Sequence, residues 1–128
     1  MNKGFGLIDT IIGLFLLGLI VVLILPIFTS VYNQYSKINS KTEMIYLGES
    51  IYERLCSKDE YSKELIDSLT HNDEVIFDDV SVEYLQKYES RIIKIEESEI
   101  FLKINIIINP KSNGGNISDV EFEASILK

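Results

Sequence analysis

The sequence is poor in the residue types that most often carry enzyme chemistry. It holds one cysteine, one histidine and no tryptophan among its 128 residues. The single cysteine, Cys56, excludes an intrachain disulfide, and together with His71 it is too little for a zinc site. No Ser–His–Asp or Cys–His arrangement can be argued from the chain. We therefore expect neither enzyme activity nor a cofactor.

Positive charge is also scarce, because 12 lysine and arginine residues stand against 20 aspartate and glutamate residues, for a net charge of −8. The excess of acid is concentrated between Asp59 and Glu99. Such a surface repels phosphate backbones and anionic lipid headgroups. Direct binding of nucleic acid is therefore not expected.

A long apolar run occupies the start of the chain. Between Leu7 and Phe28 the only side chains that are neither apolar nor glycine are Asp9, Thr10 and Pro26. A helix of this length extends roughly 33 Å, enough to cross the hydrocarbon core of a membrane. The run is longer than the apolar part of a cleaved secretory signal and is followed by no A-x-A-like site. We expect a retained single span in the cytoplasmic membrane.

The orientation of this span follows from Lys3, the only positive side chain near its start, which favours a cytoplasmic N-terminus.

Asp9 is unusual, because an aspartate in the middle of a membrane helix costs about 2.5–3.5 kcal/mol. The cost is smaller near the helix start, where the carboxylate also meets the positive end of the helix dipole. Asp9 is either solvated at the interface or functional.

The stretch "KGFGLIDTIIGLFLLGLIVVLILP" resembles the N-terminus of type IV prepilins and of the pseudopilins of type II secretion and competence systems. In that pattern a short basic leader ends in glycine, and an acid follows four residues after a phenylalanine. The resemblance makes residues 1–4 the leader, Phe5 the new N-terminus and Asp9 the acid. Pro26 falls where the family carries a proline late in the membrane helix, so a helix kink is expected there. The resemblance covers about the first thirty residues.

The resemblance implies a function. A prepilin peptidase would cut the Gly4–Phe5 bond and methylate the amine of Phe5, and Asp9 would neutralise the N-terminal amine of a neighbouring subunit. The implied partners are other pilins or pseudopilins, the prepilin peptidase, the membrane, and the assembly platform with its ATPase. The mature chain would reach the cell surface in an extracytoplasmic filament.

Two departures from the family pattern are aspartate in place of glutamate at Asp9 and glycine in place of a small polar residue at Gly6. Both favour a minor pilin or pseudopilin over the main filament protein. Whether the system is a pilus, a secretion machine or a DNA-uptake machine stays open. The alternative function is an uncleaved, single-pass anchored module that binds a partner outside the cell.

A helical pattern continues beyond Pro26, and one bent helix is expected from about Leu7 to Leu55. Its predicted apolar face consists of Val31, Tyr35, Ile38, Thr42, Ile45, Tyr52 and Leu55, widened by Met44, Gly48 and Ile51. We expect four parts: the leader 1–4, a membrane and filament-core helix 5–28, the exposed amphipathic half of the helix 29–57, and a globular part 58–128.

The globular part carries strand signals. Alternation in "EIFLKINIIIN" places Ile100, Leu102, Ile104, Ile106 and Ile108 on one face of a strand, and Val120, Phe122, Ala124 and Ile126 do the same in the last segment. "RIIKIE" predicts a third strand with Ile93 and Ile95 inward, and "VIFDDVSV" a short fourth. "NPKSNGGN" predicts a hairpin loop. Short helices are expected at Tyr61–Leu69 and within "SVEYLQKYES". The prediction is an α+β, pilin-like fold with an antiparallel sheet of three or four strands.

Three features of the globular part are weaker candidates. The acids Asp73, Glu74, Asp78 and Asp79 do not match the spacing of an EF-hand loop, so a solvated acidic surface is favoured over a calcium site. His71 lies among polar residues and is expected to be exposed without a function. Cys56 ends the helical pattern, and a buried structural thiol is favoured over a reactive or bridging one.

Overall fold

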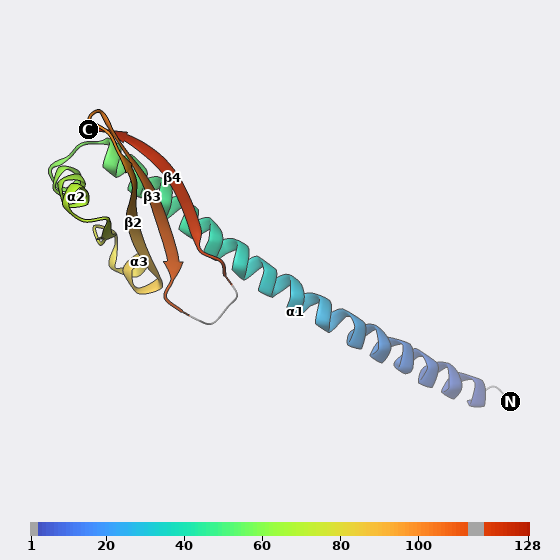
Figure 1. The fold of residues 1–128 in the computed structure, drawn as a ribbon. Helices are drawn as coiled ribbons and strands as arrows, with labels where there is room; N and C mark the ends of the chain where they lie inside the picture. The colour runs from blue at the N-terminus through green and yellow to red at the C-terminus, as the bar shows by residue number, and fades with distance from the viewer. Residues whose placement is uncertain (1–2, 113–116) are drawn as a thin grey trace. The chain divides into compact units, whose positions relative to one another are not determined.

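The computed structural model describes residues 3–112 and 117–128, and the described part forms three helices and four strands. The helices are α1 (Lys3–Cys56), α2 (Glu60–His71) and α3 (Val82–Lys87). The strands are β1 (Glu74–Phe77), β2 (Tyr88–Glu97), β3 (Phe101–Pro110) and β4 (Val120–Leu127). This α+β layout, a long apolar N-terminal helix with a four-stranded antiparallel sheet, confirms the predicted pilin-like fold class (Figure 1). The chain divides into two compact units, Met1–Ile38 and Asn39–Lys128.

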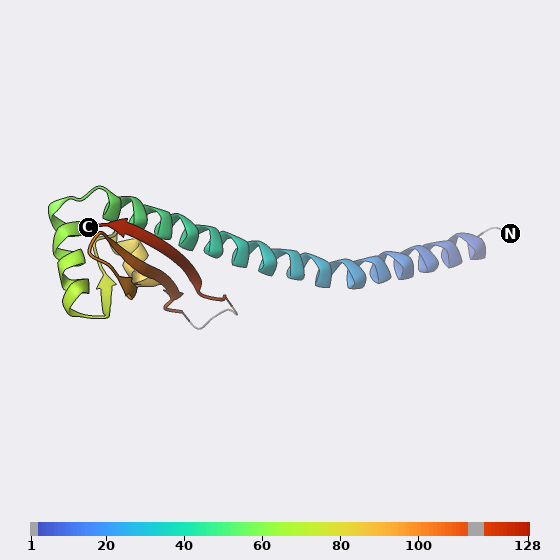
Figure 2. The ribbon, with the colours of Figure 1, turned by 45° about the horizontal axis from the view of Figure 1, so that its top comes forward.

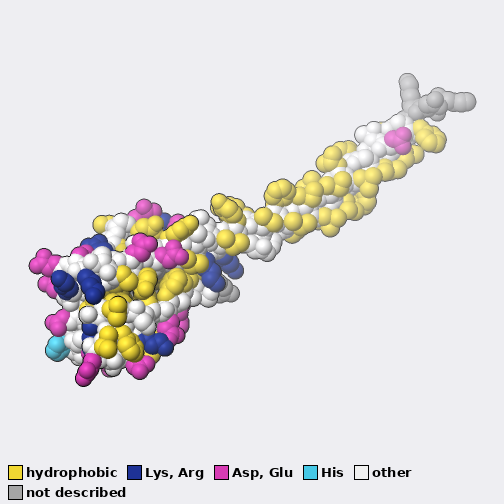
Figure 3. All heavy atoms as spheres, turned by 90° about the horizontal axis from the view of Figure 1, so that it is seen from above, with side chains coloured by type: hydrophobic (Ala, Val, Ile, Leu, Met, Phe, Trp, Pro, Cys, Tyr) yellow, Lys and Arg dark blue, Asp and Glu magenta, His cyan; other side chains and the backbone are white. Residues whose placement is uncertain are grey.

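The first unit is the N-terminal part of α1. Apolar side chains cover most of the face of this part of the helix that Figure 3 shows. Its apolar window has a mean hydropathy of 3.2, and none of it is buried within the protein. Among the described residues, α1 is the one helix that is long and apolar enough to span a membrane. The helix continues through Pro26, and the predicted kink at this residue stays a prediction.

The second unit, Asn39–Lys128, contains the sheet. The strands follow one another in the order β1-β2-β3-β4, and every neighbouring pair is antiparallel, so the sheet is a meander (Figures 1 and 2). In β3 the burial alternates along the strand, with Leu102, Ile104, Ile106 and Ile108 completely buried. In β4 the same face carries Val120 and Ile126, which are buried. The predicted alternation in these two strands is therefore confirmed.

The last turns of α1 supply the other half of the core. Met44, Leu47, Ile51 and Leu55 are buried and belong to one apolar cluster with the inward side chains of the strands. Their spacing of three and four residues defines a single helix face.

The predicted face is confirmed in part: Met44, Gly48 and Ile51, which were expected to widen it, are buried, but the row expected at its centre is not. Of the predicted row only Leu55 is buried, while Val31, Tyr35, Ile38, Thr42, Ile45 and Tyr52 are exposed. Leu47, which lies between Met44 and Ile51 on the packed face, was missed. Tyrosine and isoleucine occur on both sides of this helix, so apolar spacing alone gave two overlapping rows.

The prediction for β2 was wrong by one residue. Ile92 is completely buried, Ile93 is half-buried and Ile95 is 50% exposed. The inward face of this strand begins with Tyr88 and Ser90, and the pairing with β3 shifts register between Lys94 and Glu96. An extra residue at such a bulge turns its side chain away from the core.

Ile100 was also misplaced, because it precedes β3 and is 68% exposed. It lies in the tight connection between β2 and β3, where Ser98 N–H donates to the carbonyl oxygen of Phe101 over 2.8 Å. The predicted loop between β3 and β4 falls partly on residues 113–116, which lie outside the described residues.

At Gly48 the helix α1 lies very close to a side chain of the sheet. A β-carbon built on Gly48 would lie 2.2 Å from Cε2 and 2.6 Å from Cδ2 of Phe122, on β4. A glycine costs a helix about 1 kcal/mol relative to alanine. Here it lets an aromatic ring rest directly on the helix backbone.

Candidate functional site

The residues with predicted roles in processing and assembly lie together at the start of α1. Gly4 and Phe5 lie in its first turn, and Asp9 lies in its second turn. Phe5 is 76% exposed, and a β-carbon on Gly4 would meet nothing within 4 Å. The Gly4–Phe5 bond is therefore uncovered by the rest of the described protein, in a terminal turn of the kind that frays readily.

Phe5 and Asp9 are four residues apart, so their side chains share one face of the helix. Asp9 is exposed and forms no ion pair with any residue that the structure describes. An unpaired carboxylate at the edge of an apolar helix remains available to a cation on another molecule. Its predicted role in assembly stays a prediction.

Two threonines, one in the apolar run and one beside it, hydrogen-bond their hydroxyl groups to the helix backbone. Thr10 Oγ1 donates to the carbonyl oxygen of Gly6 over 2.7 Å, and Thr29 Oγ1 donates to that of Leu25 over 3.0 Å. Such hydrogen bonds to the preceding turn lower the cost of placing a hydroxyl in lipid. These hydrogen bonds were not predicted, although a threonine within an apolar helix is a sequence signal for them.

The end of α1 is joined to α2 by a polar cluster around Arg54. Arg54 Nε lies 2.8 Å from Asp59 Oδ2, and its guanidinium also pairs with Asp79. The ring of Tyr61 lies beneath the guanidinium carbon, 5.9 Å away, and Tyr61 donates to Asp78 over 2.7 Å. Burial and this hydrogen bond raise the pKa of Tyr61 to about 12. The cluster fixes the connection between α1 and α2.

Asp59 is the N-cap of α2, because its Oδ1 accepts from the backbone N–H of Ser62 over 2.9 Å. The hydroxyl of Ser62 is completely buried and donates to the carbonyl oxygen of Arg54 over 2.7 Å. The hydrogen bonds from Ser62, with that from Arg54, lower the pKa of Asp59 to about 2. Because the folded-state pKa lies below the ordinary value of 3.8, the ionised form stabilises the fold.

This pKa predicts a dependence of stability on pH. The contribution of Asp59 is complete above the ordinary pKa and is lost as the pH falls toward 2. Asp59→Asn keeps a capping oxygen and removes the charge. We expect its melting temperature to lie below that of the wild type at pH 6 and the difference to shrink at pH 2.5, measured by circular dichroism in detergent micelles. Glu60→Gln, which removes a neighbouring acid that forms no ion pair with any described residue, is the control. A difference that stays constant with pH would contradict the assignment.

The four acids of the predicted acidic surface have separate partners. Asp73 pairs with Lys94 and Glu74 with Arg91, at 3.5 and 3.4 Å, while Asp78 and Asp79 belong to the Arg54 cluster. Within residues 3–112 and 117–128 no group of three acidic, histidine or cysteine side chains is placed to hold a metal ion.

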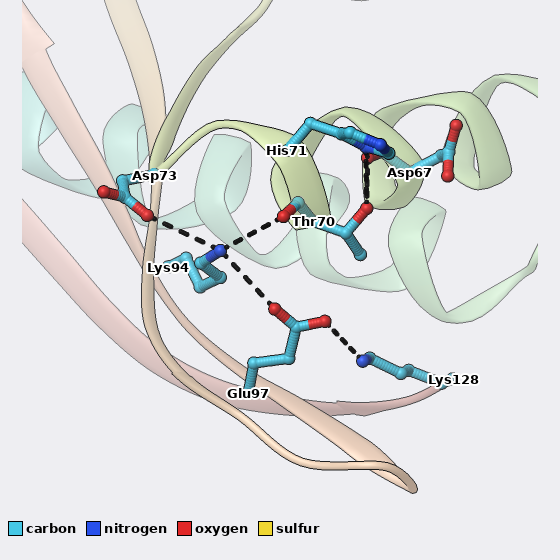
Figure 4. A network of polar contacts seen from close by, with 7 residues as sticks. All are labelled: Asp67, Thr70, His71, Asp73, Lys94, Glu97 and Lys128. Carbon is cyan, nitrogen blue, oxygen red and sulfur yellow. Dashed lines mark hydrogen bonds and ion pairs between the residues drawn. The ribbon is translucent and has the colours of Figure 1, made fainter.

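Lys94 is the centre of a second polar network, shown in Figure 4. Its side chain is 17% exposed, and its Nζ lies 3.5 Å from carboxylate oxygens of both Asp73 and Glu97 and 3.4 Å from the carbonyl oxygen of Thr70. Glu97 also pairs with Lys128 at 2.6 Å, and this lysine lowers the pKa of Glu97. The network joins the end of α2 to β2 and to the end of β4.

His71 lies beside this network and is exposed, as expected. Its Nδ1 lies 3.0 Å from both the hydroxyl of Thr70 and the carbonyl oxygen of Asp67, so its ring contacts the last turn of α2 (Figure 4).

The prediction for Cys56 was wrong, because its thiol is exposed and not buried. It follows Leu55, the last residue of the packed face. Each residue of an α-helix is rotated by about 100° from the one before it, so the side chain of Cys56 points away from the core. A hydrogen bond with Cys56 raises the pKa of Tyr52.

No family model, curated protein or solved structure matches the chain.

Proposed function

We propose that this chain is a structural subunit of a type IV pilus or of a type II secretion or competence pseudopilus. It is a minor pilin or pseudopilin that a prepilin peptidase processes at Gly4–Phe5. The observation that carries the proposal is the set formed by Gly4, Phe5 and Asp9 at the head of an apolar helix. The α+β layout, with the last turns of that helix packed against an antiparallel sheet, supports it.

The proposed mechanism is one of assembly. Cleavage creates a cationic amine at Phe5, and the carboxylate of Asp9 on a neighbouring subunit neutralises it. In a low-dielectric bundle of helices such a pair is much stronger than in water, and an unpaired charge costs several kcal/mol. A subunit is therefore stable in the filament only at the height where the two charges meet. The cytoplasmic ATPase, not this chain, supplies the energy.

Mass spectrometry after co-expression with a prepilin peptidase tests the proposal. We expect the chain to lose Met1–Gly4 and to carry a methyl group on the amine of Phe5. An intact N-terminus in the presence of an active peptidase would refute it and would favour an anchored binding module.

Gly4→Leu is the matched variant. A leucine side chain blocks the close backbone approach that the peptidase requires, so we expect the leader to remain attached. Gly13→Leu, which adds the same side chain at another uncrowded helix position, should leave cleavage unchanged.

A further inference from the structure

The unit Asn39–Lys128 carries a positively charged groove although the chain as a whole is acidic. Lys58, Lys63 and Lys128 line it, together with the apolar side chains of Ile66 and Leu127. The lining also includes Asp67 and Thr70. Leu127, at an outward position at the end of β4, is 63% exposed. This surface is called the lysine groove below.

Two lysines of this groove, Lys58 and Lys63, differ from most basic side chains of the unit in their ion pairing. In the unit's described part most basic side chains pair with acids, as Arg54, Lys87, Arg91, Lys94, Lys103 and Lys128 do. Lys58 and Lys63 form no such pair with any described residue. Lys58 is also held by the backbone, at a φ of 54°, in the turn that follows α1. Lys128 is paired with Glu97, and the lining includes the acid Asp67, so Lys58 and Lys63 together leave a modest excess of positive charge around an apolar centre.

A second groove of the same unit has the opposite charge. It lies between α1 and the edge strand β4, where Glu49 and Glu123 flank Tyr52, Phe122 and Ala124. Glu49 forms no ion pair with any described residue, whereas Glu123 pairs with Lys103. Tyr52, one of its lining residues, is 39% exposed. This acidic groove shares no lining residue with the lysine groove.

We propose that the lysine groove of one copy of this chain binds the acidic groove of a second copy. Each groove combines an exposed apolar centre with charge that the fold leaves unpaired, and the charges of the two are complementary. Because both belong to the same chain, any two copies bring the matching surfaces together. The contact involves only the unit Asn39–Lys128, so it goes beyond the proposed function and holds equally for a chain that keeps its leader.

The contact is weak in solution and effective between anchored copies. The grooves have volumes of about 320 and 390 Å³, room for a few side chains each. Exposed charge pairs contribute little individually and are screened by salt. Anchoring two copies in one membrane raises their effective concentration, which strengthens a weak contact without adding new interactions.

Zero-length crosslinking of the full chain tests this contact. Unlabelled and ¹⁵N-labelled chains are reconstituted together in phosphatidylcholine vesicles and treated with a water-soluble carbodiimide. The reagent adds to a carboxylate to form an O-acylisourea. A contacting lysine amine then attacks the acyl carbon, an amide forms, and the reagent leaves as a urea. We expect a crosslinked peptide joining Lys63 to Glu49 that contains one labelled and one unlabelled half.

Charge reversal sharpens the test. Lys63→Glu and Glu49→Lys each replace a matched pair by two like charges, and each alone should lower the yield of crosslinked dimer about fivefold. A mixture of the two variants should restore the yield, because Lys63 of the Glu49→Lys chain meets Glu49 of the Lys63→Glu chain and the two substituted positions also form an opposite-charge pair. Lys41→Glu makes the same charge change outside both grooves and should have no effect.

The proposal is overturned if Lys63 and Glu49 couple only within one chain, or if the mixture of variants crosslinks no better than either alone. Neither result bears on cleavage at Gly4–Phe5, so failure of this contact is distinguishable from failure of the proposed function.

Discussion

Gly48→Val should lower the free energy of unfolding of the unit Asn39–Lys128 by about 2–3 kcal/mol, and its melting temperature by about 10 °C. Even the first added carbon would lie 2.2 Å from the ring of Phe122, and valine adds two more. The ring is half-buried, so it can move only by leaving its contact with α1 or by pushing β4 away. Urea unfolding of the full chain in detergent micelles, followed by the tyrosine signal, measures the change.

A double-mutant cycle distinguishes this clash from a general effect of valine in a helix. In a Phe122→Ala background the obstructing ring is absent, and a larger residue at position 48 regains the helix propensity that glycine lacks. We therefore expect Gly48→Val to be neutral or slightly stabilising there. Equal destabilisation in both backgrounds would show that the close approach of Phe122 to Gly48 does not determine the effect.

The strands and helices could be predicted from the sequence more reliably than their inward faces. The alternation of isoleucines from Leu102 to Ile108 has a single interpretation, because every second residue is apolar and the others are mixed. Near Ile93 the sequence has two apolar residues side by side, so alternation is compatible with either register. The buried Tyr88 and Ser90 and the bulge after Lys94 decide in favour of Ile92. These are tertiary effects that local pattern does not contain.

The candidate site was predictable to a different degree in each unit. Gly4, Phe5 and Asp9 are close in sequence and lie on one helix, so their spacing fixes their arrangement. The two grooves unite residues from distant segments, such as Glu49 with Glu123 and Lys63 with Leu127. Gly48 illustrates the same limit, since its cost to the helix is visible in the sequence and its contact with Phe122 is not.

Asp9→Ala should lower the amount of this chain recovered in sheared filaments by more than about tenfold, while its insertion into the membrane stays unchanged. The expected loss rests on the proposed function: without the carboxylate, the amine of a neighbouring Phe5 is left unpaired in an apolar bundle, which is strongly unfavourable. Insertion should be unaffected because alanine is less costly than aspartate in a membrane helix. Comparing the filament fraction with the carbonate-resistant membrane fraction separates the two steps.

Asp9→Glu and Asp9→Asn test the chemistry of this contact. Glutamate restores the length that is usual in the family that the N-terminus resembles, so Asp9→Glu should assemble at least as well as the wild type. Asparagine keeps the shape of aspartate without its charge, and Asp9→Asn should fail like Asp9→Ala. Normal filaments with Asp9→Asn would show that charge neutralisation does not set the position of the subunit. Filaments lost with Asp9→Glu would instead show that the shorter side chain is required, because the neighbouring amine then lies closer to the helix than glutamate allows.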